Sequence, residues 1–311
     1  MSSLICGSLA YDNIMQYDRR FAEALLADQL HNINVSFLAP SMRREFGGCA
    51  GNIAYNLKLL GGEPLIMAVV GQDSLHYLER LRSLGISTKN IRVIDSAFTA
   101  QCFIVTDIDN NQITAFHPGA MSFAHENKVA DAGPVKFSIV APDGRDAMLQ
   151  HAEHSAALHI PLIFDPGQNF PLFNGDELKH FIDLATYITV NGYEAESLAA
   201  RTGLSLEQIA GQVSALIITR GALGAEIFTN GQKIDIPCVP AETIADPTGC
   251  GDAFRAGILF GLNKGMDWTT TGRLSSLMGS IKIASQGPQN HAPTLAEIDA
   301  RFHQAFGYRF T

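Results

Sequence analysis

The residues with the clearest chemical potential lie in Asp246–Gly257, where a Gly-x-Gly turn leads directly into an apolar, helix-forming sequence. Glycine lets backbone amides approach a ligand closely. The first amides of a helix lack internal acceptors, and the helix dipole adds partial positive charge there. Gly249, Cys250 and Gly251 are therefore predicted to form an anion hole for a phosphoryl group. Asp252 follows in the first helical turn and is the predicted base that accepts the proton of an attacking hydroxyl.

An aspartate at the start of a helix is also a common cap, so other motifs must support the chemical interpretation. Asn191 and Glu194 follow a predicted strand; they either form the capping box of the next helix or orient a water-coordinated Mg²⁺. Thr219, Gly221 and Gly224 lie in a second Gly-rich turn, which suits the phosphates or ribose of a nucleotide but could be a plain hairpin turn. Three such motifs at strand ends in one chain favour a catalytic site over three unrelated caps and turns.

Short apolar runs that alternate with helical stretches must position these motifs. The runs are rich in Ile and Val and are bounded by Gly, Pro, Asn or Asp, which predicts buried strands. They are Ser3–Ser8, Pro64–Val70, Phe137–Ala141, Pro161–Phe164, Tyr187–Val190 and Ala215–Thr219. The helical stretches between them include Ala50–Leu60, Arg145–Ala157, Asp176–Leu184 and Tyr193–Thr202. The alternation predicts an α/β fold with a mostly parallel sheet flanked by helices, and ligands beyond the carboxyl ends of its strands.

Two segments have strand character without long helices between them, namely Leu30–Arg44 and Thr99–His117. In the second, Cys102–Ile108 and Gln112–His117 flank Asp109–Asn111, a favourable hairpin turn. We interpret both segments as a small β-sheet lid beside the core. The C-terminal part of the chain is predicted to be largely helical, at Ala253–Asn263, Thr269–Ser285 and Leu295–Phe306.

Composition restricts the class of protein. The 311 residues are 46% hydrophobic and 17% charged, as is typical of a globular chain. The formal net charge of −9 does not favour binding to nucleic acid or to an anionic membrane. No apolar run has the length of a membrane span, and the basic region of a secretion signal is missing at the N-terminus. The five cysteines form no CxxC pair, so we expect reduced thiols, no zinc site and a cytoplasmic location.

Together, these motifs resemble the ribokinase-like, or PfkB, family of carbohydrate kinases over essentially the whole chain. Asp246–Asp252 is similar to the C-terminal signature of that family. Gly47–Asn52, followed by Leu60–Gly62, is similar to its N-terminal signature, and the Asn191 and Thr219 motifs match in order. Within the family the chain is most similar to bacterial adenosine kinases, at Gly7–Ser8, Asp12, Arg20–Phe21, Leu30–His31, Ser36–Leu38 and Phe116–Met121.

The resemblance implies a single unit with a Rossmann-like ribokinase fold. Residues 1–8, 45–98 and 121–311 would form the core, and residues 9–44 and 99–120 the lid, with the substrate between them. Family members often form dimers through their lids. Because the first lid segment carries apolar side chains, we expect a homodimer, although the inner face of the lid could account for the same side chains.

The resemblance also implies substrate contacts. Asp12 would accept hydrogen bonds from both ribose hydroxyls, helped by Gly48 and Asn52. A carboxylate suits two neighbouring hydroxyls, although Asp12 could instead be a turn residue. Aromatic faces in the lid could sandwich a purine or simply pack the lid core. The other expected substrate contacts are Ser8, Ser36, Phe37, Gly47, Phe103, Phe116 and Gln168.

The implied cofactors are ATP, as phosphoryl donor, and Mg²⁺, held by Glu194 through water. A monovalent cation such as K⁺ would lie beside Asp246 and Thr248, near Gln286–Gln289, which loosely resembles the segment that closes the nucleotide and potassium sites. Arg255 lies roughly one helical turn after the predicted base and either reaches the phosphates or pairs with a surface carboxylate. The expected ATP contacts are Asn191, Thr219, Gly221, Gly224 and Gly251.

The leading functional hypothesis is adenosine kinase, an enzyme of purine salvage that converts ATP and adenosine into ADP and AMP. One alternative is a broader nucleoside kinase acting on guanosine, inosine or cytidine; another is a sugar kinase for ribose or fructose. The aromatic lid favours a base over a bare sugar, but one or two side chains could decide which base. A nucleotide sensor without catalysis is the non-enzyme alternative, and an intact Asp252 argues against it.

Overall fold

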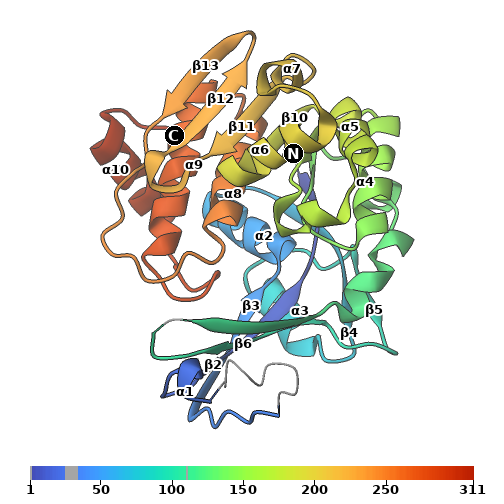
Figure 1. The fold of residues 1–311 in the computed structure, drawn as a ribbon. Coiled ribbons are helices and arrows are strands. Elements are labelled where there is room, and N and C mark those ends of the chain that lie inside the picture. The colour runs from blue at the N-terminus through green and yellow to red at the C-terminus, as the bar shows by residue number, and fades with distance from the viewer. Residues whose placement is uncertain (1, 25–33, 110) are drawn as a thin grey trace.

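The computed structural model describes residues 2–24, 34–109 and 111–311, which form two β-sheets (Figure 1). The larger sheet has nine strands in the order β13-β12-β11-β10-β9-β8-β1-β4-β5. Strands from β11 to β5 pair in parallel, whereas β12 and β13 are antiparallel to their neighbours. The strands are β1 (Ser3–Cys6), β4 (Pro64–Gly71), β5 (Ile91–Ile94), β8 (Phe137–Val140), β9 (Leu162–Phe164), β10 (Tyr187–Asn191), β11 (Ala215–Thr219), β12 (Ala225–Thr229) and β13 (Gln232–Ile236).

Helices cover both faces of the larger sheet. One face packs against α2 (Cys49–Leu59), α3 (Leu75–Ser83), α8 (Cys250–Lys264), α9 (Trp268–Ile283) and α10 (Leu295–Phe306). The other packs against α4 (Arg145–Ala157), α5 (Gly175–Leu184), α6 (Gly192–Thr202) and α7 (Leu206–Ala210). Short connecting elements are α1 (Phe21–Ala24) and the 3-10 helices η2 (Gly119–Glu126), η3 (Val129–Ala132), η4 (Gly167–Leu172) and η5 (Gly221–Leu223).

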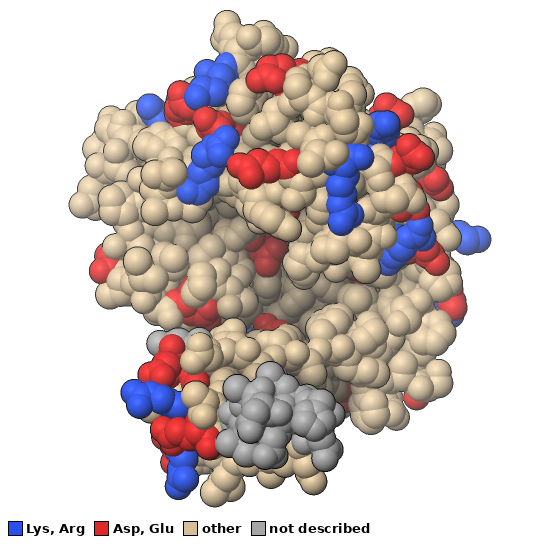
Figure 2. All heavy atoms as spheres, in the orientation of Figure 1, with Lys and Arg blue, Asp and Glu red and all other residues tan. Residues whose placement is uncertain are grey.

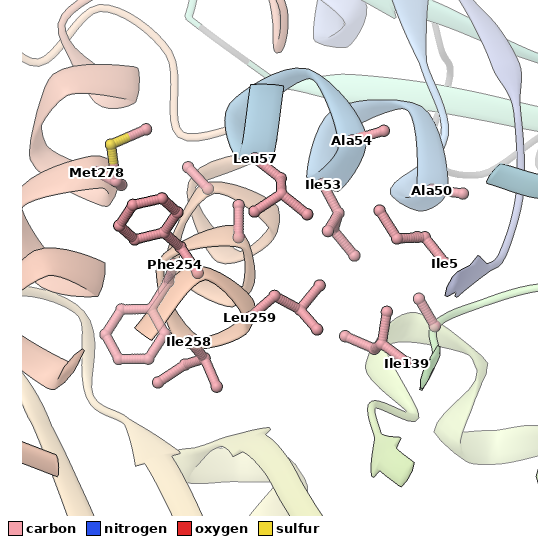
Figure 3. Packing of buried hydrophobic residues seen from close by; sticks show 14 of the residues in the cluster. Ile5, Ala50, Ile53, Ala54, Leu57, Ile139, Phe254, Ile258, Leu259 and Met278 are labelled. Carbon is pink, nitrogen blue, oxygen red and sulfur yellow. The ribbon is translucent and has the colours of Figure 1, made fainter. Parts of the chain in front are cut away.

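Strand β1 shows why two cores form. Its side chains alternate between the faces, so Ile5 belongs to one buried cluster while Leu4 and Cys6 belong to the other. In Figure 3, α2 and α8 pack their apolar side chains against each other and toward Ile5 and Ile139. Burial of each such side chain contributes about 1.5–3 kcal/mol, and this packing holds the start of α2 beside the start of α8.

The smaller sheet lies below the body in Figure 1 and has the order β3-β2-β6-β7. Asp12 lies beside Glu45 and Cys102, and Cys102 lies opposite Phe116. These four side chains therefore share one face, while Phe103, the next residue along, faces the other side. The strands are β2 (Ala10–Gln16), β3 (Ser41–Gly47), β6 (Ala100–Thr106) and β7 (Gln112–His117).

The predicted fold class is confirmed: a mostly parallel sheet flanked by helices is joined to a small second sheet. The predicted core strands and helices are present, with ends that move by a few residues at most. Strands β5, β12 and β13 were not predicted. Most side chains of β5 and β13 are half-exposed or exposed, and in β12 buried side chains alternate with half-buried ones, so the sequence lacks the continuous apolar run of a buried strand.

The lid prediction needs one correction. Residues 34–40 have no regular structure, and β3 begins only at Ser41. Pro40 has no backbone N–H to donate, and proline is rare inside strands. Residues 25–33, which belong to the predicted lid and include Leu30–His31, lie outside the described residues, as do Met1 and Asn110. The boundaries proposed for core and lid stay a prediction.

The structure also describes the thiols and the lengths of the helices. All five cysteines are free, and Cys6 and Cys49 are buried. In the described part of the chain, no helix combines the length and the apolar character needed to cross a bilayer.

Candidate active site

The candidate site lies where two cavities meet at the start of α8. The larger encloses about 730 Å³, and residues at or just beyond the carboxyl ends of β9, β10 and β11 line it. The smaller encloses about 460 Å³ between the lid sheet and the core. In Figure 2 a hollow separates body and lid, and acidic side chains are visible inside it. The residues that line both cavities are Cys49, Pro142, Gln168, Gly249 and Asp252.

Gly249 determines how α8 begins. It is the N-cap residue, and its φ of 81° lies in the left-handed region that favours glycine. A Cβ atom at this position would lie 2.8 Å from Cβ of Pro288, so a larger residue would be strained and crowded. The amides of Gly251 and Asp252 lie in the first turn, where no helical carbonyl precedes them.

Cys250 departs from the predicted anion hole. Its backbone N–H donates to the carbonyl of Pro247 at 3.1 Å, so this donor is engaged within the loop. The amide of Cys250 is therefore engaged within the loop, while the anion hole at Gly249 and Gly251 stays a prediction; the neighbouring amide of Asp252 also lies in the first turn of α8.

A chain of side-chain hydrogen bonds holds Asp252. Nδ2 of Asn52, on α2, donates to Oδ2 of Asp252 at 2.8 Å. Oδ1 of Asn52 accepts a hydrogen bond from Nε2 of Gln289 at 3.0 Å. Nε2 of Gln289 also donates to the hydroxyl of Tyr77 at 3.0 Å. The orientation of the Asn52 amide is thereby fixed. Asn52 was predicted as a substrate contact, and the structure additionally gives it a contact with Asp252, the predicted base.

Burial has the largest effect on the charge of Asp252. Burial, with a smaller contribution from the carboxylate of Asp165, raises the pKa of Asp252 to about 6, while Asn52, Arg255 and Cys49 act in the opposite direction. The helix dipole favours the ionised carboxylate at the start of α8, but loss of solvation has the larger effect on its pKa. A carboxylate with this pKa is a stronger base than a solvated aspartate and is still mainly ionised at neutral pH.

Asp12 extends from β2 into the smaller cavity. Gly47 makes room for it, because a Cβ atom on Gly47 would lie 2.5 Å from Oδ2 of Asp12. Burial raises the pKa of Asp12 to about 6, and the carboxylates of Asp246, Glu45 and Asp252 raise it as well. Hydroxyl donors from a ligand would stabilise the ionised form.

The two raised pKa values predict the pH dependence of catalysis. In the predicted roles, Asp252 must be unprotonated to accept a proton, and Asp12 must be ionised to accept two hydroxyl hydrogen bonds. We expect kcat/KM for the acceptor to be constant above about pH 7 and to fall below about pH 6, with a logarithmic slope between one and two. Asp12→Ala should reduce this slope to one. An acid limb centred near pH 4 in the unmodified enzyme would contradict the assignment.

Several other predicted substrate contacts meet in the smaller cavity. Its lining includes Ser8, Gly48, Phe116 and Gln168. The hydroxyl of Ser8 accepts the amide N–H at the start of α2 at 3.2 Å, which joins β1 to that helix. Sequence reasoning did not identify Met121 and Asn169, which also line this cavity.

Other predicted residues are not brought into the cavities. Phe37 packs against Tyr17 and Phe21, with ring centroids 5.0 and 5.1 Å away, and Ser36 is exposed beside it. Phe103 lies on the face of the lid sheet opposite Asp12, because side chains alternate along a strand. For these three residues the predicted position in the pocket is not the one that the structure gives.

The two predicted strand-end motifs lie at the larger cavity. The N–H of Glu194 donates to Oδ1 of Asn191 at 2.9 Å, and the N–H of Asn191 donates to Oε2 of Glu194 at 2.8 Å, which forms the capping box of α6. Both residues also line the cavity, as do Thr219 and Gly221. Gly224 is not among the lining residues; a Cβ there would meet the carbonyl of Ile236, so its role is in the turn.

Arg255 forms a buried ion pair that sequence reasoning missed. Its Nη2 donates to Oδ1 of Asp165 at 2.7 Å, just beyond the end of β9, and both side chains are at most 8% exposed. The partner is therefore a buried carboxylate, not a surface one. Arg255 also lines the larger cavity, so its positive charge lies beside the first turn of α8.

The oxygen atoms of Asp246, one of the two residues predicted to lie beside a monovalent cation, accept hydrogen bonds from protein donors. Oδ1 and Oδ2 of Asp246 accept the amides of Thr248 and Gly287, each at 2.9 Å. The carbonyl of Asp246 accepts Nζ of Lys282 at 2.7 Å. Over residues 2–24, 34–109 and 111–311, no three His, Cys, Asp or Glu side chains gather as a metal site. These contacts do not fit the potassium site that we predicted.

Comparison with known proteins adds an independent finding. The sequence profile of the pfkB family carbohydrate kinases matches residues 9–295 of this chain. A nucleoside kinase from Methanocaldococcus jannaschii is 31% identical over 277 residues, which cover 87% of this chain and 90% of that protein.

Solved structures give the same result. The nucleoside kinase of Burkholderia thailandensis in complex with inosine has a TM-score of 0.90 and 56% identity to this chain, and 99% of each chain is covered. The same kinase in complex with ADP-inosine has a TM-score of 0.88 and 57% identity, with 99% of this chain and 97% of that chain covered. These relatives are named nucleoside kinases and not specifically adenosine kinases.

Proposed function

This chain belongs to the pfkB family of carbohydrate kinases, phosphotransferases that act on a hydroxyl group, and we propose that it phosphorylates the 5′-hydroxyl of a ribonucleoside with ATP. One observation carries the proposal: Asp252 lines both cavities, so a carboxylate with a raised pKa lies where two bound molecules would meet. The relative whose structures hold inosine and ADP-inosine supports a nucleoside and an adenine nucleotide as these two molecules.

In the proposed reaction, the nucleoside lies in the smaller cavity with its ribose hydroxyls on Asp12 and its 5′-hydroxyl near Asp252. The 5′-oxygen attacks the γ-phosphorus of ATP, the bond from that phosphorus to ADP breaks, and the hydroxyl proton passes to Asp252. The amides of Gly251 and Asp252 and the guanidinium of Arg255 stabilise the negative charge of the transferring group. Positioning by these groups supplies most of the rate enhancement in phosphoryl transfer.

ATP is proposed to lie in the larger cavity, along Asn191, Thr219 and Gly221. The residues present fit a Mg²⁺ held through water, because the buried Glu194 lines this cavity and burial raises its pKa, a cost that a cation would offset. Glu194 and Asn191 would orient the waters of the ion. Mg²⁺ would neutralise charge on the β- and γ-phosphates.

Adenosine is the first substrate that we propose, with AMP as the product. The complex of the 56% identical relative with inosine favours a broader purine specificity as the second candidate. Gln168 and Asn169 line the nucleoside cavity, and because Nδ2 of Asn169 already donates to the carbonyl of Asp143, the amide that we propose reads the base is that of Gln168. An amide can donate or accept, and this suits either a 6-amino or a 6-oxo purine.

An acceptor screen tests the proposal. With ATP and Mg²⁺ present, kcat/KM should be compared for adenosine, inosine, guanosine, cytidine, ribose and fructose. We expect the best purine ribonucleoside to exceed both sugars by about tenfold or more, because only a nucleoside fills the cavity beside Phe116. A sugar as the best acceptor would contradict the proposal and favour the sugar kinase alternative.

We also propose a homodimer formed through the lids. A row of apolar side chains crosses the outer face of the lid sheet, since Met42 pairs with Met15, Met15 with Val105, and Val105 with Ile113. Met42 is 66% exposed and Ile113 is 41% exposed. A second copy would cover this row.

Sedimentation tests the dimer. At micromolar protein we expect a dimer that Met42→Glu converts to monomer, because a charge within an apolar interface is costly to bury. Exposed Lys89→Glu, which lies outside the lid, is the control and should leave the dimer intact. A monomer alone in the unmodified protein would refute the assembly.

A further inference from the structure

Lys282 is a fully buried cation. It lies in the last turn of α9 with 0% of its surface exposed. Its Nζ donates to the backbone carbonyls of Asp246 at 2.7 Å and Ser285 at 3.1 Å. Lysine is almost never buried completely unless its charge has partners. The carboxylates of Asp246 and Glu45 provide negative potential around it, while loss of solvation lowers the pKa of Lys282.

The two carbonyls belong to segments that build the active site. Asp246 begins the loop that leads to the anion hole, and its carboxylate accepts the amides of Thr248 and Gly287. Ser285 begins the second segment, in which Pro288 closes on Gly249 and Gln289 holds the amide that orients Asp252. The ammonium of Lys282 therefore joins the two segments that position Asp252, one beginning at Asp246 and the other at Ser285.

We propose that Lys282 is a built-in monovalent cation, whose ammonium does the work that a bound K⁺ was predicted to do beside Asp246 and Thr248. An ammonium group and K⁺ carry the same charge, and carbonyl oxygens bind either one. The ammonium is tethered, so the loop keeps its shape at any potassium concentration. Lys282 is thus a positioning residue for the anion hole.

The proposal predicts opposite ion responses in the unmodified enzyme and in Lys282→Ala, which removes the charge and leaves space for an ion. Rate and melting temperature should be compared in KCl, NH₄Cl and choline chloride at equal ionic strength. The unmodified enzyme should respond less than about twofold to K⁺. Lys282→Ala in choline should lose about tenfold in kcat, and K⁺ or NH₄⁺ should restore most of it and raise its melting temperature. Lys264→Ala removes an exposed lysine from the last turn of α8 and should behave as the unmodified enzyme.

If K⁺ activated the unmodified enzyme by more than about twofold, the proposal would be wrong. This measurement needs no variant, so it decides the matter even if Lys282→Ala does not fold. A folded Lys282→Ala protein whose melting temperature and kcat do not distinguish K⁺ from choline would overturn the proposal as well. The rate measurements rest on the proposed function, whereas the melting temperature does not. An enzyme inactive on every nucleoside would refute the function and still leave the ion response of the variant to decide the role of Lys282.

Discussion

Asp252→Asn should lower kcat by a factor of about 100 or more while the KM for the acceptor changes little, because general base catalysis usually contributes at least this much. Asparagine keeps the shape of the side chain and its hydrogen bond from Asn52, but it cannot take up the proton of the 5′-hydroxyl. Steady-state rates with saturating ATP and Mg²⁺, together with nucleoside binding measured by calorimetry, separate the chemical step from binding.

The control for this variant is Asp176→Asn. Asp176 is also an acidic residue in the first turn of a helix, α5, but it is exposed and does not line either of the two cavities. The Asp176→Asn variant should leave kcat unchanged. If Asp252→Asn kept more than about a tenth of the original rate, Asp252 could not be the base.

Asp12 should determine the preference for ribose over deoxyribose. A 2′-deoxynucleoside leaves one buried acceptor without its donor, which costs about 1–3 kcal/mol and corresponds to roughly 5- to 150-fold in kcat/KM. Asp12→Ala should remove most of this preference while lowering kcat/KM for the ribonucleoside. The measurement is kcat/KM for adenosine and 2′-deoxyadenosine with both enzymes.

Gln16→Ala is the matched control, because Gln16 lies on the same strand and face as Asp12 but is exposed at the strand end. It should keep the ribose preference of the unmodified enzyme. Equal efficiency on both nucleosides in the unmodified enzyme would show that Asp12 does not bind the ribose hydroxyls.

The parts of the site that sequence reasoning could predict are local patterns. The Gly-x-Gly turn before Asp252 specifies a helix start, and the Asn191 and Glu194 pair specifies a capping box, which the structure contains. Each pattern depends on a few residues that are neighbours in the sequence. The positions at strand ends then follow from the parallel sheet, since all its carboxyl ends lie along one edge.

The supports of these residues could not be predicted in the same way. Asn52 and Asp252 are 200 residues apart, and Gln289 and Asn52 are 237 apart. Glutamine and asparagine are ordinary loop and helix residues, and nothing local distinguishes these two. Their pairing depends on the packing of α2 against α8, which only the folded core provides.

The lid aromatics are a different case, because the sequence held a signal that was not used. A hairpin that turns at Asp109 pairs Cys102 with Phe116 and Phe103 with Ala115. Phe103 and Phe116 must then face opposite sides of the sheet, so at most one of them can face the nucleoside. The register, fixed by the turn, separates them without any structure.

We propose that this chain transfers a phosphoryl group from ATP to the 5′-oxygen of a nucleoside held against Asp252. The most direct test is to incubate the enzyme with ATP, Mg²⁺ and adenosine or inosine and to follow the products by phosphorus NMR. We expect ADP and a nucleoside 5′-monophosphate in equal amounts, with little ADP when the nucleoside is omitted. ADP formation that does not depend on a nucleoside, or a phosphate on another hydroxyl, would contradict it.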